Sequence, residues 1–379
     1  MDFELDDMQR MLLDGAEKLM KPRMSVDLWR HRKAGATGFD AAAWAQFADL
    51  GWLALPLAEE AGGLGGSMID VALLMTALGR GLAVDPYVST AIVGTHMLAR
   101  PDGGFADLLG RVITGDARLA LAHGEAGTGY DPGAGRDSRA RAEAGGGYRL
   151  DGAKTLVRDA PSATHLIVSA MLDGEIALFL VPADAAGVAL ESYPLIDGSR
   201  GADVTLAGVA VGADALIARG AAALDLIEAA SDRATLAHVA MAVGAMEACL
   251  DLCSEYLKER RQFGQPIGKF QALQHMIVTM LVSTNQARSA LYAGLAAIDA
   301  EPARRAYAVS AAKLVANDAM QLVSRTGVQL FGGFGVTDEY AISHYYRALI
   351  VLEKLNGDTA FHLDRMARTA PDSAYDFYG

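Results

Sequence analysis

Two clusters of residues in the last third of the chain have the types and spacing to bind an anionic ligand. One is Arg260-Arg261-Gln262-Phe263-Gly264, and the other is Gln329-Leu330-Phe331-Gly332-Gly333. A guanidinium presents fixed, charge-assisted donors that suit a diphosphate. Adjacent glycines let backbone N–H groups approach a phosphate closely. The alternative is that the two arginines are solvated charges at a helix end and that the glycines form an ordinary turn.

The elements that must position these clusters divide the chain into helical, β and helical parts. Apolar residues recur at helical spacing from 3 to about 111, a period-two pattern runs from about 118 to 217, and the helical period returns from 221. We expect an α+β fold with an N-terminal helical domain over 1–117, an antiparallel β domain over 118–220 and a C-terminal four-helix bundle over 221–379.

Turn residues separate the expected strands and helices within these parts. Asp151-Gly152, between Tyr148–Leu150 and Lys154–Val157, predicts a two-residue hairpin turn. Further strands are expected over 165–170, 176–181, 188–192 and 202–211. Long helices are expected over 221–261, 270–300 and 303–330, and another over 344–367 with a break near Gly357. No apolar β run precedes the glycine-rich stretch Glu59–Gly66, so it predicts a turn between helices and not a dinucleotide loop.

Composition excludes several classes of protein. The 379 residues carry a net charge of −13, which argues against nucleic acid because phosphate binding needs a basic surface. No run reaches the roughly 18–20 apolar residues of a membrane span, and the acidic stretch Met1–Asp7 is unlike a targeting peptide. We expect a cytoplasmic protein with no membrane partner and no metal. Cys249 and Cys253, four residues apart, are expected to be core thiols.

The motifs, in this order, resemble the acyl-CoA dehydrogenase family over essentially the whole chain. Lys154–Val157, Val328–Gly333 and Gly357-Asp358 are similar to one bacterial branch, which includes the pimeloyl-CoA dehydrogenase small subunit and steroid side-chain acyl-CoA dehydrogenase subunits. The resemblance implies FAD as cofactor, an acyl-CoA substrate and electron-transfer flavoprotein as acceptor. It assigns FAD contacts to Arg260, Gln262, Phe263, Gln271, Gln329, Gly332, Gly333, Thr128, Val157 and Arg158, and substrate contacts to Asp232, Arg233 and Thr128.

The resemblance is weaker where the β part should cover the flavin ring. Glu125-Ala126-Gly127 keeps the register and Thr128 replaces a serine, but Ala122 replaces a threonine and Leu156-Val157-Arg158 replaces the family's Trp-Ile-Thr/Ser. Arg158 could stabilise an anionic reduced ring or a substrate carboxylate. An exposed arginine at a strand end is the alternative.

The family's catalytic base is a glutamate that precedes a late glycine, and Gly357 places Asn356 at that position. Other members carry the glutamate earlier, where this chain has Ala234. An amide has no proton affinity near neutrality, so it cannot act as the base. Both known base positions therefore lack a carboxylate.

The resemblance then implies α,β-desaturation of an acyl-CoA with a homologous partner chain that supplies the glutamate, in a heterotetramer. The alternatives are a homotetramer with another flavin reaction, such as oxygenation, and a non-catalytic subunit. Within this chain, the candidates for a replacement base are Asp358, Glu353, Asp232 and His238. Asp358 is two residues past the base position, roughly 200° around a helix.

Overall fold

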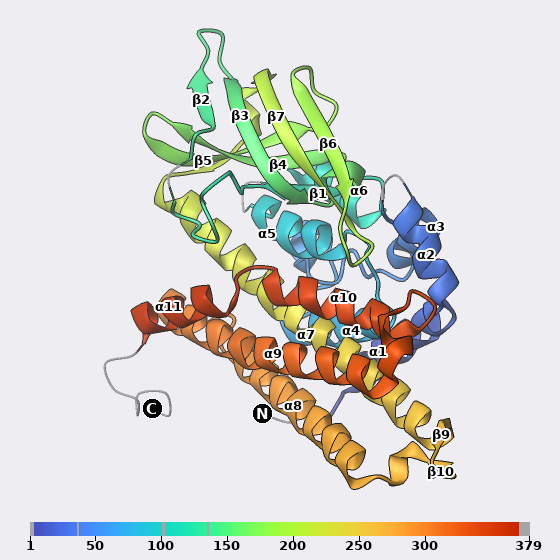
Figure 1. The fold of residues 1–379 in the computed structure, drawn as a ribbon. Helices are drawn as coiled ribbons and strands as arrows, with labels where there is room; N and C mark the ends of the chain where they lie inside the picture. The colour runs from blue at the N-terminus through green and yellow to red at the C-terminus, as the bar shows by residue number, and fades with distance from the viewer. Residues whose placement is uncertain (1–3, 36–37, 101–102, 135, 371–379) are drawn as a thin grey trace. The chain divides into compact units, whose positions relative to one another are not determined.

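A computed structural model describes residues 4–35, 38–100, 103–134 and 136–370 (Figure 1). Residues 1–3 of the acidic N-terminal stretch and residues 371–379 of the expected C-terminal domain lie outside the described residues. The chain packs into two compact units. The helical unit comprises Met1–Arg30, Met68–Ala83 and Thr235–Gly379, and the sheet unit comprises His31–Ser67 and Val84–Ala234. The limits of the three domains drawn from the sequence stay a prediction.

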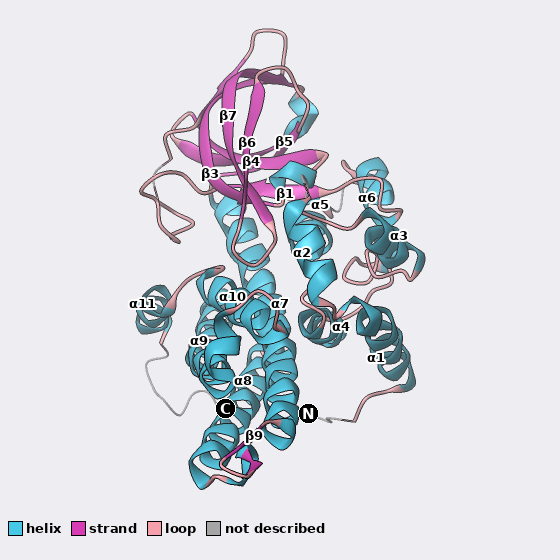
Figure 2. Cartoon of the chain, turned by 45° about the vertical axis from the view of Figure 1, so that its right-hand side comes forward, coloured by secondary structure: helices cyan, strands magenta, loops and turns pink. Residues whose placement is uncertain are grey.

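The sheet unit contains the long strands of the chain (Figure 2). They are β1 (Leu119–Ala122), β2 (Arg139–Ala142), β3 (Tyr148–Arg158), β4 (His165–Leu172), β5 (Glu175–Pro182), β6 (Val188–Pro194), β7 (Arg200–Val211) and β8 (Leu216–Arg219). The strand order is β6-β7-β3-β2-β4-β5-β8, with β1 paired to β4. β1 and β2 run parallel to β4. The sheet is thus mixed and not wholly antiparallel, because residue alternation carries no information about strand direction.

The hairpin turn predicted at Asp151-Gly152 is wrong. β3 continues through both residues and pairs with β7 on either side of them, and the register shifts between Leu150 and Gly152. Gly152 has φ +149, and a Cβ there would collide with Ser138. Long-range pairing with β7 overrides the local turn signal and leaves a β-bulge, a common place for a strand glycine.

Short helices complete the sheet unit. They are α3 (Ala41–Asp49), the π-helix Val88–Gly94, α5 (Thr95–Leu98), α6 (Ala106–Ile113) and the first part of α7 (Ala221–Glu259). Apolar side chains of α6 and α7, such as Leu109 and Ile227, share a buried cluster with Ile167 and Leu178 of the sheet. The turn expected within Glu59–Gly66 is confirmed: it includes the 3₁₀ turn Glu59–Ala61 and connects α3 with α4 (Met68–Arg80).

The helical unit contains the long helices. They are α1 (Asp7–Met20), the start of α2 (Val26–Ala34), α4, the rest of α7, α8 (Gln271–Ala296), α9 (Pro302–Phe331), α10 (Ala341–Lys354) and α11 (Thr359–Thr369). The predicted helices and the predicted break near Gly357 are confirmed. α9 packs against α8, α10 and α11, which gives the expected C-terminal helical bundle.

Two glycines allow α4 and α7 to cross closely within this unit. A Cβ on Gly79 would overlap the carbonyl of Met241, and a Cβ on Gly244 would overlap the carbonyl of Thr76. Small residues at such a crossing let two helix backbones approach each other. A larger side chain at either position would force the helices apart.

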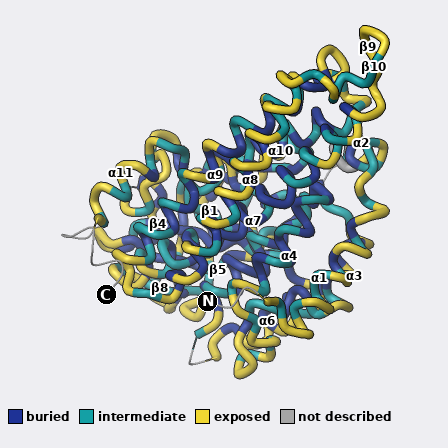
Figure 3. Tube along the Cα trace, turned by 90° about the horizontal axis from the view of Figure 1, so that it is seen from below, coloured by how far each residue is buried: buried dark blue, intermediate teal, exposed yellow. Residues whose placement is uncertain are grey.

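α7 is the one helix among the described residues that is long and apolar enough to span a membrane. Its most apolar window is 72% buried inside the structure, and core helices of folded proteins pass the same test. Seen from below, most of α7 is coloured as buried (Figure 3).

Candidate functional site

The segment that connects α10 to α11 holds Asn356 in a fixed geometry. Asn356 has φ +60, and its side-chain oxygen lies 2.7 Å from His238 Nδ1 on α7. Its main-chain oxygen lies 3.1 Å from His362 Nε2 on α11. An amide oxygen only accepts hydrogen bonds, so His238 Nδ1 and His362 Nε2 must both carry hydrogen. Asn356 is therefore fixed through its side chain to α7 and through its backbone to α11.

Gly357 and Asp358, the next two residues, belong to the same segment between α10 and α11. Gly357 has φ +121, and a Cβ there would lie 2.7 Å from His362 Nε2 and collide with the Phe361 ring. The carboxylate of Asp358 accepts the Phe361 N–H at 3.0 Å and caps the N-terminus of α11. Asp358, a candidate replacement base, thus has a structural partner.

A buried lysine, which the sequence reasoning missed, lies beside Glu353. Lys313 of α9 is 0% exposed, and its Nζ donates to the Leu352 carbonyl near the end of α10 at 2.6 Å. Burial lowers the pKa of Lys313 to about 7, although the charge of Glu353 acts in the opposite direction. Glu353 is itself 5% exposed and lies 3.1 Å from Lys354 Nζ. In the sequence, the sign of this burial is that Lys313 is a lone lysine on an apolar face of its helix.

The residues around the second base position belong to the middle of α7. Asp232, Ala234 and Thr235 are buried, and Arg233 is half-buried. The sequence placed Asp232 and Arg233 near the substrate, and these assignments stay predictions.

The two clusters proposed for phosphate binding meet in the helical unit. Arg260 precedes a hairpin of β9 (Arg261–Gln262) and β10 (Gln265–Pro266), and its guanidinium carbon lies 5.7 Å from the ring centroid of Phe334. Phe334 belongs to the 3₁₀ turn Gly332–Val336, which directly follows α9. Tyr256, four residues before the first cluster, stacks on Phe331 of the second cluster, with ring centroids 4.2 Å apart. Residues about 70 positions apart in sequence thus form one surface.

This surface is open to solvent. Phe263 at the hairpin tip is 90% exposed with φ +51, and the tip is drawn as exposed in Figure 3. The other predicted FAD contacts of this unit, Gln262, Gln271, Gln329, Gly332 and Gly333, are also exposed. An arginine, amides and glycines on one open face can bind a phosphate.

The predicted FAD contacts of the sheet unit are engaged in local interactions. Thr128 Oγ1 donates to the Glu125 carbonyl at 2.9 Å and accepts the Glu125 N–H at 3.2 Å. Val157 is buried in the sheet core. Arg158 forms a 3.0 Å ion pair with Asp197, so it differs from an exposed strand-end arginine, and its charge is neutralised.

Four buried polar side chains and the half-buried His123 are linked by hydrogen bonds in a cluster that the sequence reasoning missed. We call His123, Glu125, Arg136, Lys154 and Ser169 the sheet cluster. Lys154 is 0% exposed, and its Nζ lies 2.5 Å from Glu125 Oε1 and 3.2 Å from Ser169 Oγ. Arg136 Nη2 lies 2.5 Å from His123 Nε2, and His123 Nδ1 lies 2.9 Å from Ser169 Oγ.

The donor in each of these bonds follows from chemistry. A guanidinium only donates, so His123 accepts at Nε2 and donates from Nδ1 to Ser169. Burial, with the charges of Arg136 and Lys154, lowers the pKa of His123 to about 3, so the ring is neutral. Burial lowers the pKa of Lys154 to about 8, while Glu125 acts to raise it.

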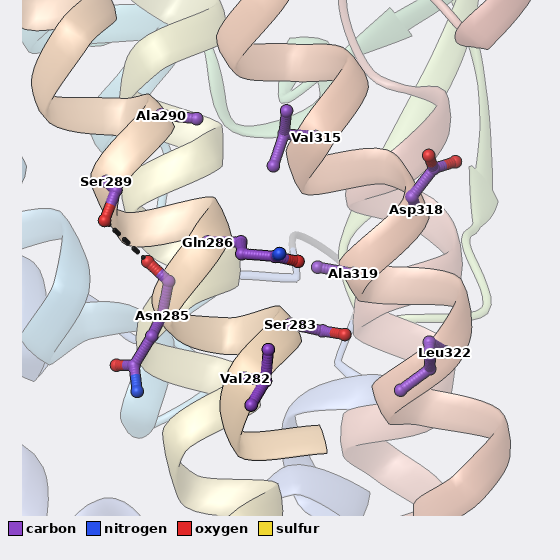
Figure 4. A pocket seen from close by; sticks show the side chains of 10 residues that line it. All are labelled: Val282, Ser283, Asn285, Gln286, Ser289, Ala290, Val315, Asp318, Ala319 and Leu322. Atoms are coloured by element: carbon purple, nitrogen blue, oxygen red, sulfur yellow. Dashed lines mark hydrogen bonds between the residues drawn. The ribbon is translucent and has the colours of Figure 1, made fainter. Parts of the chain in front are cut away.

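A groove of about 690 Å³ lies between α8 and α9 (Figure 4). α8 exposes Val278, Leu281 and Val282, three apolar residues at helical spacing, each about half accessible to solvent, and Val282 also lines the groove. The groove is lined by Val282, Ser283, Asn285, Gln286, Ser289 and Ala290 of α8 and by Val315, Asp318, Ala319 and Leu322 of α9. Half of these lining residues are apolar and half are polar, and the exposed apolar residues of α8 are suited to packing against another helix.

Among the residues with described positions, no group of three or more His, Cys, Asp or Glu side chains could hold a metal ion. The two cysteines are both buried and free, as predicted for core thiols.

Comparison with known proteins adds three matches to family models. They are the acyl-CoA dehydrogenase N-terminal domain over residues 6–101, the middle domain over 120–207 and the C-terminal domain over 224–370. Acyl-CoA dehydrogenase FadE27 of Mycobacterium tuberculosis is 30% identical over 342 residues, 87% of this chain and 88% of that protein.

Solved structures are also similar over nearly the whole chain. The steroid ACAD Tcur3481-Tcur3483 is 29% identical with a TM-score of 0.86, and the match covers 96% of this chain and 97% of that one. The ChsE4-ChsE5 complex from Mycobacterium tuberculosis is 26% identical with a TM-score of 0.87, over 98% of this chain and 100% of that one.

Proposed function

Because this chain belongs to the acyl-CoA dehydrogenase family, we propose that it is an FAD-binding subunit that works with a homologous partner chain. Together the two chains desaturate an acyl-CoA thioester between its α and β carbons and pass the electrons to electron-transfer flavoprotein. The glutamate that removes the α proton comes from the partner.

The observation that carries this proposal is that an amide, Asn356, occupies the position of the family's base and is held by a hydrogen bond to His238. The reaction needs a carboxylate to take the α proton, and a positioned base contributes about 10²–10⁴-fold to the rate. Asn356 provides an amide whose oxygen accepts a hydrogen bond from His238. Asp358 caps α11 and Glu353 is buried beside two lysines. These contacts leave neither carboxylate a clear role as the base.

The surface around Arg260 fits FAD. When bound, FAD accepts the hydride that leaves the β carbon. Arg260 would donate to the pyrophosphate, and the backbone of Gly332 and Gly333 would approach the cofactor without steric hindrance. The exposed Phe263 and the open face around it favour a site that a second chain completes.

The groove between α8 and α9 supports an assembly of several chains. The half-exposed apolar residues of α8 include Val282, which lines the groove, and a homologous helix could bury them. Two similar solved structures are of the paired proteins Tcur3481-Tcur3483 and ChsE4-ChsE5, and the second is a complex. We therefore propose a heterotetramer in preference to a homotetramer.

The test compares the purified chain with the chain co-expressed with a homologue that carries the glutamate. We expect the chain alone to show no flavin bleaching with a panel of acyl-CoA esters, and the co-purified complex to hold FAD and bleach with at least one of them. Rapid desaturation by this chain alone would overturn the partner role.

Two variants of the complex give the matched control. Replacement of the partner's glutamate by glutamine should abolish bleaching, whereas Asn356→Ala in this chain should leave most of the rate. If Asn356→Ala abolishes bleaching while FAD content and assembly stay normal, the chemistry resides in this chain.

A further inference from the structure

The sheet cluster has more positive than negative charge. Lys154 and Arg136 are cations, Glu125 is the single carboxylate among the five residues, and His123 is neutral. Both oxygens of Glu125 are already in use, because Oε1 accepts from Lys154 at 2.5 Å and Oε2 accepts the Asp137 N–H at 2.6 Å. The cluster therefore holds an excess of one positive charge that no carboxylate within it neutralises.

Arg136 carries this excess charge. It is 3% exposed, and its Nη2 contacts His123 Nε2 and the carbonyls of Asp131 and Pro132, at 3.1 and 3.4 Å. Within the described part of the chain, its buried Nε and Nη1 have no hydrogen-bond partner. Asp131, whose charge also acts on Arg136, is exposed, and its carboxylate accepts the Gly133 N–H. Burial lowers the pKa of Arg136, although the charges of Glu125 and Asp131 act in the opposite direction, so an anion bound nearby would stabilise this cation.

The cluster also holds the loop to which the family resemblance assigns flavin contacts. Glu125 ties the start of the loop to the backbone of Asp137 at its end, and the Gly124 carbonyl accepts the Thr155 N–H at 2.9 Å. Glu125 thus joins the two ends of the loop that contains Thr128, and Gly124 ties its start to β3. By contrast, Arg158 is paired with Asp197 and brings little net charge.

We propose that the excess positive charge of the sheet cluster, carried by Arg136, stabilises the anionic, reduced form of the flavin ring. The cluster takes the role that one interpretation of the sequence assigned to Arg158. This inference rests on the proposed function, because it requires FAD in this chain. Arg136 acts as a positioning and electrostatic residue, since a preorganised charge in a water-poor site favours the state that carries the opposite charge.

The experiment measures the flavin midpoint potential of the complex with Arg136→Gln. We expect reduced flavin to bind about tenfold more weakly relative to oxidised flavin, which lowers the potential by about 30 mV for a two-electron couple. Arg136→Lys should retain most of the wild-type potential because it keeps the charge. Arg141→Gln is the matched control, since it removes an exposed charge from β2 of the same sheet.

The outcomes separate this inference from the proposed function. If the wild-type complex holds no FAD, the proposed function fails. If Arg136→Gln binds FAD and keeps the wild-type potential, or shifts it no more than Arg141→Gln does, the electrostatic role is overturned.

A second measurement covers the case in which Arg136→Gln loses the cofactor. Thermal unfolding of the apo chain should then show Arg136→Gln to be at least as stable as wild type, because the substitution removes a buried, unpaired charge. A large loss of apo-chain stability would identify Arg136 as a structural residue and overturn the inference.

Discussion

Removal of Lys154 should destabilise the sheet unit strongly, because Lys154 is the cation that contacts the buried Glu125 carboxylate, whereas Arg136 contacts His123. In Lys154→Met, Glu125 keeps the Asp137 N–H but loses a 2.5 Å ion pair. Breaking a buried pair on one side costs about 3–5 kcal/mol. The double variant Lys154→Met/Glu125→Gln removes both charges, so it should recover at least about 2 kcal/mol of that loss.

The loss should also depend on pH. In the wild type, burial would raise the pKa of Glu125, but Lys154 and the backbone of Asp137 lower it overall. Without Lys154 the folded-state pKa of Glu125 should rise above the unfolded value. The folded variant then binds the extra proton, so Lys154→Met should recover stability as the pH falls from about 6 towards 4.

Urea unfolding followed by tryptophan fluorescence measures these effects, with Trp44 and Trp52 as reporters in the sheet unit. Each unit needs its own transition in the fit, since the chain has two compact units. A loss below about 1 kcal/mol in Lys154→Met would refute the reasoning, because that is the range of a solvent-exposed pair.

Three further predictions concern the helical unit. Because burial lowers the folded pKa of Lys313 to about 7, the unfolded chain binds more protons between about pH 7 and 10; wild type should gain stability across that window in urea titrations, and Lys313→Met should lack this gain. Gly357→Ala should lower the unfolding free energy by about 2–4 kcal/mol in thermal denaturation, since φ is +121 and the new methyl collides with Phe361; a loss below about 0.5 kcal/mol would contradict the geometry. Arg260→Gln should weaken FAD binding to the complex at least about tenfold in a fluorescence titration, whereas the exposed neighbour variant Arg261→Gln should bind nearly as wild type does; equal losses would argue against a specific contact.

Periodicity predicts the helices and most strands well, because it reports which face of each element is buried. α9 was expected over 303–330 and occupies Pro302–Phe331. The same pattern gives no information on strand direction, so the parallel pairing of β1 and β2 with β4 was missed. At Gly152 a strong local turn signal was overridden by pairing with β7.

The contacts of the candidate site were harder to predict because they join distant segments. The pair of His238 with Asn356 spans 118 positions, and no spacing rule connects them. Lys154 and Lys313 were not expected to be buried, since a lysine inside an apolar pattern is usually placed at the surface. Their counter-charges, Glu125 and Glu353, become visible only when the fold brings the elements together.

The contact between Asn356 and His238 also limits how this chain could acquire a base of its own by mutation. A carboxylate introduced by Asn356→Glu would arrive beside an imidazole that already presents its Nδ1 hydrogen. The carboxylate would accept that hydrogen in a hydrogen bond, which stabilises its charged form, lowers the pKa of the acid and makes it a weaker base. A single substitution would therefore give a locked carboxylate, and a second change at His238 would be needed to release it. The path from this sequence to a self-sufficient dehydrogenase thus requires at least two coupled steps, the first of which brings little catalytic advantage.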